Sequence, residues 1–432
     1  MPTAPRVLGT GSLGPSLTIG ARNTGPMLQP AEPSVETRSS WVVASVVLLV
    51  MAVAFGAPWI TNVALKNIAA EVNGERSIPA LAGALMWIGS GVGGIFMGRV
   101  AERLGVRFTF VFGSVMIAAG LAISTLGPSW PLYIGHGLFI GFLGIGGINA
   151  PSYVYVSQWF DRRRGSALAL ISSGSYLAGA LWPSVFARTI AYFGWRETML
   201  YFAALQVLVI VPATLLAMRR PPKVTYHATA SGAEHGKRSV MGWPPNLVFA
   251  LQLGAIFTCC IPMSMPQAHL VALCSDLGIS AAHGAAMVSV LLAAAFMSRQ
   301  IWGVISDRIG GLYTMLAGSG LQALGMAAFL LTQDEVGLFT VAALFGLGFS
   351  GLVPANVLAS RELFPPGDAY WRMPSLLLFS GWGMAGGGWL AGLLYDHFGY
   401  YAPAFATGLG VNLINLALVT TLALRKRFAV AV

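Results

Sequence analysis

Long apolar runs separated by short polar breaks dominate the sequence from Trp41 onward. A helix of about 20 apolar residues is long enough to cross the roughly 30 Å hydrocarbon core of a bilayer. The pattern therefore predicts an all-α membrane protein with twelve spanning helices. Their expected ranges are 41–65, 79–98, 108–127, 131–156, 165–187, 198–218, 246–271, 283–305, 312–332, 336–360, 373–394 and 401–424.

The longest polar interval between these runs divides them six and six. We expect an N-terminal six-helix bundle over 41–218, a linker over 219–245 and a C-terminal six-helix bundle over 246–424. The remaining ends, 1–40 and 425–432, are expected to be tails, and the first is expected to be disordered because it is rich in Gly, Pro, Ser and Thr.

Features of the first bundle recur in the second at a separation of about 204 residues, which is the signature of an internal repeat. The matched features are Gly98, Glu102 and Arg103 with Gly303, Asp307 and Arg308; Pro58 with Pro262; Gly144 and Gly147 with Gly348 and Gly351; and Phe193 and Gly194 with Phe398 and Gly399. Duplicated six-helix bundles bind their substrate near the bilayer midplane, between the halves.

Composition excludes a soluble enzyme. Charged residues make up 9% of the 432 residues and hydrophobic residues 56%, whereas soluble domains carry about 25% charged residues. The net charge of +10 comes without a long basic cluster, so no nucleic-acid partner is expected.

The positive charges instead predict the orientation, because Lys and Arg are retained on the cytoplasmic side. If both termini are cytoplasmic, all but four of the Lys and Arg residues outside the spans fall on the cytoplasmic side. Arg299 is the one that lies within a span. Those four are Lys66, Arg76, Arg188 and Arg196. A multi-pass protein of the plasma (inner) membrane is expected.

Two loop sequences resemble the signature loops of the major facilitator superfamily. They are GRVAERLGVR, from Gly98 to Arg107, and GVISDRIGG, from Gly303 to Gly311. The resemblance implies gating roles for Gly98, Glu102, Arg103, Gly303, Asp307 and Arg308. The glycines lack side-chain bulk, so a neighbouring helix can approach closely, and each acidic residue can face a helix N-terminus.

A finer resemblance, to the monocarboxylate porter and oxalate/formate antiporter branch, covers most of the membrane-embedded chain. It rests on QWFDRRRGSA (158–167), FGWR (193–196) and LYDHFGY (394–400). The resemblance implies transport of small carboxylates.

Arg299 is the strongest candidate for an anion-binding residue. It lies eight residues before Asp307 on the expected eighth helix, which places it about 12 Å inward from the membrane boundary. A buried Arg is costly and needs a counter-ion, a wet cavity or an anionic ligand, and its planar fork can hold a carboxylate through two hydrogen bonds. The resemblance likewise implies that Arg299 binds substrate. The alternative is an Arg bonded to backbone carbonyls or extended to the interface.

Departures from the branch weaken the case for proton symport. Its proton-coupled members commonly carry Asp one turn before this Arg and Lys on helix one, where this sequence has Ala295 and Trp59. The second cation of oxalate antiporters is also absent from 374–395. One central cation favours a monoanion, carried by exchange or by facilitated uniport.

Further candidates are Pro58 and Pro262, which are expected to bend helices one and seven and to form gates. Aromatic residues that could enclose the organic part of the substrate are Trp59, Tyr153, Tyr176 and Trp382. Each has packing as its alternative role. The four histidines near span ends, His136, His269, His283 and His397, are expected to be interfacial residues.

No cofactor and no metal site are expected. Three closely spaced cysteines match no zinc pattern, and no phosphate-binding loop is present. The sequence thus favours a monomeric secondary transporter of small organic anions that works by alternating access. The alternatives are a carrier or exporter of a neutral or drug-like molecule and, outside transport, a membrane sensor. A membrane enzyme is disfavoured because no buried nucleophile and base are paired.

Overall fold

A computed structural model describes residues 36–160, 163–218, 239–365 and 369–430. These residues belong to one unit of the chain, Val35–Val432. The expected tail 1–40 and linker 219–245 lie mostly outside the described residues, as does the end of the expected tail 425–432. We call residues 36–218 the first half and residues 239–430 the second half.

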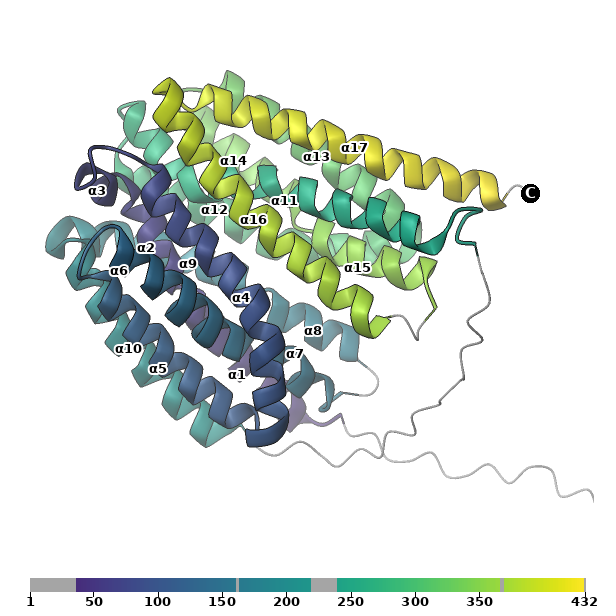
Figure 1. Ribbon diagram of the computed structural model, residues 1–432, viewed down its shortest axis with the longest axis horizontal. Helices are drawn as coiled ribbons and strands as arrows, with labels where there is room; N and C mark the ends of the chain where they lie inside the picture. Colours follow the sequence, from purple (N-terminus) through teal and green to yellow (C-terminus); the bar gives the residue numbers. More distant parts are fainter. Residues whose placement is uncertain (1–35, 161–162, 219–238, 366–368, 431–432) are drawn as a thin grey trace, which may run out of the picture. The chain divides into compact units, whose positions relative to one another are not determined.

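The first half contains α-helices and one π-helix, η1 (Figure 1). The elements are α1 (Arg38–Ala54), α2 (Ala57–Val63), α3 (Leu65–Ala70), α4 (Ser77–Leu104), α5 (Val106–Ser124), α6 (Trp130–Ile134), η1 (Gly135–Ile145), α7 (Gly146–Ser157), α8 (Arg164–Ser172), α9 (Gly174–Phe193) and α10 (Trp195–Ala217).

The second half is built from longer helices. They are α11 (Pro245–Asp276), α12 (Ala281–Ile309), α13 (Gly311–Leu331), α14 (Glu335–Phe349), α15 (Leu352–Leu363), α16 (Ala369–Phe398) and α17 (Ala402–Val430). Because α17 extends to Val430, the first residues of the expected C-terminal tail are helical.

The all-α membrane fold predicted from the sequence is confirmed. Every expected span coincides with a helix or with consecutive helices, and the described residues contain 11 helices long and apolar enough to cross a membrane. The expected span that has no such helix is the fifth, 165–187, which is broken at Ser173 into the consecutive helices α8 and α9. Neither α8 nor α9 is both long and apolar enough to count as a spanning helix. α8 has only 9 residues, and the mean hydropathy of α9 is lowered by its Ser, Tyr, Trp and Pro residues and by Arg188.

The two proline positions behave differently. The first span is interrupted at Phe55 and Gly56, and Pro58 follows in the first turn of α2, where its missing N–H leaves no hydrogen bond unmade. In contrast, α11 continues without interruption through Pro262 and Pro266. The interruption in the first span therefore has no counterpart in α11, and the bends and gating roles expected at Pro58 and Pro262 stay predictions.

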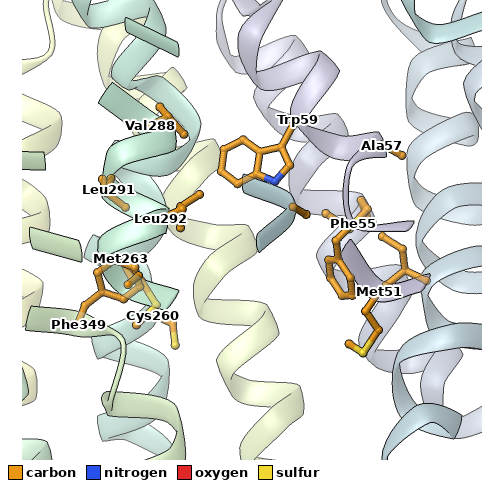
Figure 2. Packing of buried hydrophobic residues seen from close by; sticks show 14 of the residues in the cluster. Met51, Phe55, Ala57, Trp59, Cys260, Met263, Val288, Leu291, Leu292 and Phe349 are labelled. Carbon is orange, nitrogen blue, oxygen red and sulfur yellow. The ribbon is translucent and has the colours of Figure 1, made fainter. Parts of the chain in front are cut away.

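The two halves meet along two helix pairs, α4 with α16 and α9 with α12. Figure 1 shows α4 and α16 running side by side. The second contact is tight at Gly179 on α9, where a Cβ atom would lie 2.1 Å from Leu292 and 2.7 Å from Trp59. Figure 2 shows the Trp59 indole reaching toward Leu292 and Val288 of α12. Only glycine fits there without displacement.

Candidate functional site

A cavity of about 220 Å³ lies between the two halves. Its walls come from α1, α2, α4, α7, α8 and α9 of the first half and from α11, α12, α15 and α16 of the second. A cavity enclosed by both halves is where relative movement of the halves would open or close a binding site.

Arg299 is the one charged side chain among the described residues that line this cavity. Its Nη1 donates hydrogen bonds to the carbonyl oxygen of Ser172 at 2.9 Å and to the Ser172 hydroxyl at 3.1 Å. Its Cζ lies 4.6 Å from the centre of the Tyr176 ring, within the range of a cation–π contact. Its buried Nε has no hydrogen-bond partner among the described residues. The guanidinium therefore retains unused donor capacity.

Both partners of Arg299 come from the first half, while Arg299 belongs to α12. Ser172 is the last residue of α8, at the break before α9. Helix C-termini leave carbonyl groups without intrahelical partners, and these carry partial negative charge. The break thus presents an acceptor that the sequence analysis did not anticipate, because a serine in an apolar span resembles ordinary packing.

Three of the four aromatic candidates line the cavity. Trp59, Tyr153 and Tyr176 surround it, together with Pro58. Trp382 does not line it: its side chain is 39% exposed and packs against Phe379, with ring centres 5.3 Å apart. The reason is helical periodicity, because α16 faces the cavity with residues spaced four apart, and a residue two positions on points to the opposite side. The cavity-facing residues of α16 are Ser380, Met384 and Gly388.

Several polar or aromatic lining residues were not singled out from the sequence. Asn62, Trp87 and Ser380 contribute to the wall. Uncharged residues within apolar spans carry no positional signal until the rotation of each helix is known.

A cluster of charged and phenolic groups joins the halves at the end of the molecule where α4 begins, which we call the Arg76 end. The Arg76 guanidinium contacts both oxygens of Asp276 at 2.5 and 2.7 Å, and Lys66 Nζ lies 3.0 Å from the same carboxylate. The backbone N–H groups of Arg76 and Ser77 donate to Asp396 at 2.7 and 2.9 Å. All ion pairs described between the two halves lie at this end.

Arg76 is 5% exposed and remains charged. Burial alone would lower the pKa of Arg76, but the hydrogen bond to Asp276 and the charge of that carboxylate raise it above its ordinary value. The guanidinium also lies over the Tyr395 ring, 3.6 Å from its centre. Removing Asp276 would leave a buried charge uncompensated.

Comparison with known proteins places this architecture in a family. A family model described as Major Facilitator Superfamily matches residues 47–270 and 252–430. The chain belongs to the major facilitator superfamily. The first matched segment covers most of the first half and extends into α11, and the second begins within α11 and covers the rest of the second half.

Relatives within the superfamily are distant. The chain is 23% identical over 301 residues to an uncharacterized MFS-type transporter, YcxA, of Bacillus subtilis, covering 68% of this chain and 73% of that protein. It is 26% identical over 350 residues to monocarboxylate transporter 13 of Rattus norvegicus, covering 79% of this chain and 77% of that protein.

Solved structures share the fold. A bacterial homolog of the human lysosomal transporter Spinster, in an inward-facing and occupied conformation, matches with a TM-score of 0.61 at 16% identity, covering 92% of this chain and 97% of that chain. A POT family transporter in complex with 5-aminolevulinic acid matches with a TM-score of 0.65 at 15% identity, covering 89% and 96%.

The superfamily signature loops lie at the end opposite the cluster, which we call the Glu102 end. Glu102 and Arg103 are exposed in the last turn of α4, and Asp307 and Arg308 in the last turn of α12. Among the described residues, neither Glu102 nor Asp307 forms an ion pair.

The signature glycines are unobstructed in this conformation. A Cβ atom at Gly98 or at Gly303 would meet no other atom within 4 Å. The close helix approach expected at these glycines is therefore not made here. The transporter's two halves are joined by ion pairs at the Arg76 end, whereas its signature glycines at the Glu102 end remain free.

Two histidines expected at the membrane interface are buried instead. His136 is fully buried, with Nε2 2.7 Å from Thr61 Oγ1 and Nδ1 3.1 Å from Ser124 Oγ. His269 is also fully buried, with Nδ1 2.9 Å from the Tyr401 hydroxyl and Nε2 2.8 Å from the Gly388 carbonyl oxygen. The expectation was wrong for these two because helix packing supplies polar partners that hydropathy does not reveal. His283 and His397 are exposed.

Proposed function

We propose that this transporter carries small organic monoanions, specifically monocarboxylates, by alternating access, with Arg299 as the anion receptor. The observation that carries the proposal is a single guanidinium with an unpartnered Nε, facing a cavity that both halves enclose. The similarity to monocarboxylate transporter 13 supports the same substrate class.

Charge balance supports a monoanion. No carboxylate side chain is present among the described lining residues, so Arg299 gives the site one positive charge. A substrate carboxylate can accept two parallel hydrogen bonds from the guanidinium. A dianion would bring an extra negative charge into an apolar site with no second cation, at a cost of several kcal/mol or more.

The lining supports a small organic body. The Trp59, Tyr153 and Tyr176 rings provide apolar surface close to Arg299. The volume of about 220 Å³ is below the range of roughly 300–1,000 Å³ that is typical of pockets for drug-sized ligands. A monocarboxylate of a few carbon atoms suits these dimensions.

The positively charged loops support an orientation in which the Glu102 end and both termini face the cytoplasm. The membrane that we propose is the plasma (inner) membrane. The conformation would then be closed toward the outside by the Arg76 cluster. Because no carboxylate accompanies Arg299 among the described lining residues, anion exchange or facilitated uniport suits the site. The working unit that we propose is a monomer.

The test is uptake into proteoliposomes together with thermal-shift titration against small mono- and dicarboxylates. Arg299→Ala is expected to abolish saturable monocarboxylate uptake and ligand-induced stabilisation. Arg188→Ala, which removes an exposed arginine of α9, is the matched control and should transport normally. Normal uptake by Arg299→Ala would refute the proposed receptor. Acceleration of uptake by internal substrate supports exchange, whereas strict dependence on a proton gradient would refute it.

A second candidate is a carrier or exporter of a neutral or drug-like molecule. It is favoured by the methionines in the cavity wall, because methionine side chains adapt to varied ligand shapes. These residues are Met51, Met86, Met263 and Met384. Uptake of a methyl ester at the rate of its parent carboxylate would favour this candidate over the anion carrier.

A further inference from the structure

A chain of hydrogen bonds leads from the ion pairs of the Arg76 end to the wall of the cavity. Arg76 Nη1 lies 2.8 Å from the Tyr401 hydroxyl, which lies 2.9 Å from His269 Nδ1. His269 Nε2 lies 2.8 Å from the carbonyl oxygen of Gly388, and Gly388 lines the cavity. The imidazole therefore connects the closed end to the substrate site.

The partners determine where the protons of this chain lie. The Gly388 carbonyl can only accept, so His269 Nε2 carries a hydrogen. Arg76 can only donate, so the Tyr401 oxygen accepts from it and the Tyr401 O–H points toward His269 Nδ1. This arrangement satisfies both nitrogens of a neutral imidazole.

A protonated His269 would disrupt the arrangement. Its Nδ1–H and the Arg76 N–H would both point at the Tyr401 oxygen, and the Tyr401 O–H would have to turn away. A second cation would also lie beside the buried Arg76, and like charges at short range repel.

The surrounding charges do not offset this repulsion, since they are already engaged. The cationic neighbours are Arg76 and Lys66, and the phenols are Tyr395 and Tyr401. The Asp276 carboxylate is held by Arg76 and Lys66, and the Asp396 carboxylate accepts from backbone N–H groups of the first half. The closed cluster thus favours neutral His269.

We propose that His269 is a proton-binding site of this transporter, empty while the Arg76 end is closed and occupied when that end opens. When the halves part, Arg76 leaves with the first half, and the Tyr401 oxygen no longer has to accept from it. His269 Nδ1 then takes a proton from hydronium, which is released as water, and the new Nδ1–H donates to the Tyr401 oxygen. External acid therefore shifts the conformational equilibrium toward the state open at the Arg76 end. The inference rests on the alternating access of the proposed function, but not on the identity of the substrate.

The experiment measures opening of the Arg76 end without substrate. Spin labels are placed on Leu126→Cys and Ala282→Cys, two exposed positions at this end, one in each half. The three native cysteines, Cys259, Cys260 and Cys274, are replaced by Ala. Distances are measured by pulsed electron paramagnetic resonance at about pH 7.5 and about pH 5.5, on either side of the range in which histidine titrates.

We expect the long-distance population to grow on acidification, with the open-to-closed ratio changing by at most about tenfold per pH unit, the limit for one proton. His269→Gln can donate to Gly388 and accept from Tyr401 but cannot take up the proton, so it should remove the pH dependence. His136→Gln changes the second fully buried histidine of the described residues and should leave the pH dependence intact. Tyr401→Phe removes the donor to Nδ1 and should move the opening midpoint to higher pH.

Persistence of the pH response in His269→Gln, or no response in the parent, would overturn the inference. An unchanged midpoint in Tyr401→Phe would also count against it, even if His269→Gln failed to fold. The same measurement in the Arg299→Ala background separates the two proposals. Loss of carboxylate uptake with an intact pH response would leave both standing, and unchanged uptake with an intact response would refute the anion receptor alone.

Discussion

Arg299 and Ser172 lie on opposite halves of the transporter and are joined by hydrogen bonds of 2.9 Å to the carbonyl oxygen and 3.1 Å to the hydroxyl. The sequence left two alternatives for Arg299, an arginine bonded to a backbone carbonyl and an anion receptor, and the contacts of Arg299 are compatible with both. One nitrogen is engaged by a helix-terminal carbonyl, while Nε remains unpartnered among the described residues. A substrate carboxylate that took the place of Ser172 would bind Arg299 and would remove one hydrogen-bonded contact between the halves.

The Ser172 contact should depend on the backbone more than on the side chain. Ser172→Ala removes the hydroxyl but keeps the carbonyl, so substrate affinity should change by less than about threefold, or roughly 0.6 kcal/mol. Arg299→Lys keeps the charge but loses the planar fork, and should weaken affinity by about tenfold or more. Substrate-dependent uptake rates check both. Equal losses in the two variants would show that the hydroxyl anchors the arginine.

Gly179 should be intolerant of a side chain. In Gly179→Ala the new Cβ would lie 2.1 Å from Leu292 Cδ1 and 2.7 Å from the Trp59 ring, so the Leu292 and Trp59 side chains must move. We expect destabilisation of about 1–3 kcal/mol, measured by thermal unfolding in detergent. Gly320→Ala is the matched control, because nothing lies within 4 Å of its Cβ position. Adding Leu292→Ala should recover part of the loss, and failure of that rescue would contradict the steric explanation.

Gly98→Leu and Gly303→Leu should separate stability from transport. Both positions face open space in this conformation, so the unfolding temperature should not fall. Uptake should nevertheless decrease strongly if the halves approach each other at the Glu102 end during the cycle. Thermal unfolding and proteoliposome uptake of the same preparations provide the measurement. Normal uptake by both variants would remove these glycines from the gate.

Stability should fall at acid pH through Glu71. The hydrogen bond from Arg196 lowers the pKa of Glu71 below its ordinary value of 4.5, against the opposing effect of burial, and a hydrogen bond from Trp195 adds to the lowering. A carboxyl group whose pKa is lowered in the folded state stabilises the protein above its unfolded pKa, and this contribution is lost as the pH falls through the lower folded value. The relevant window therefore lies below about pH 4.5.

Thermal unfolding of the wild type and of Glu71→Gln, followed from about pH 6 to about pH 3, tests this linkage. The stability difference between the two proteins should shrink as the pH decreases through the window. Both side chains of the Glu71 and Arg196 pair are about one third exposed, so the effect should also decrease at high salt. A constant difference across the range would assign the effect of the substitution to packing.

The helical spans could be predicted from the sequence because their signal is local. The length of an apolar run determines whether it can cross a bilayer, and Arg299 is conspicuous because a charge in such a run is costly. The fifth span shows the limit of this reasoning. Its apolar residues predicted one helix, and only packing revealed the break at Ser173 that presents the Ser172 carbonyl to Arg299.

Tertiary structure decided which way each helix faces and which distant residues meet. Rotation of α16 turned Trp382 away from the cavity and Gly388 toward it, and packing of the halves brought Arg76 against Asp276 and Tyr401. A hydropathy pattern without a strong moment does not specify helix rotation, because an apolar helix in a membrane can be apolar on every side. Those choices depend on contacts between residues hundreds of positions apart, and such contacts exist only once the helices are packed.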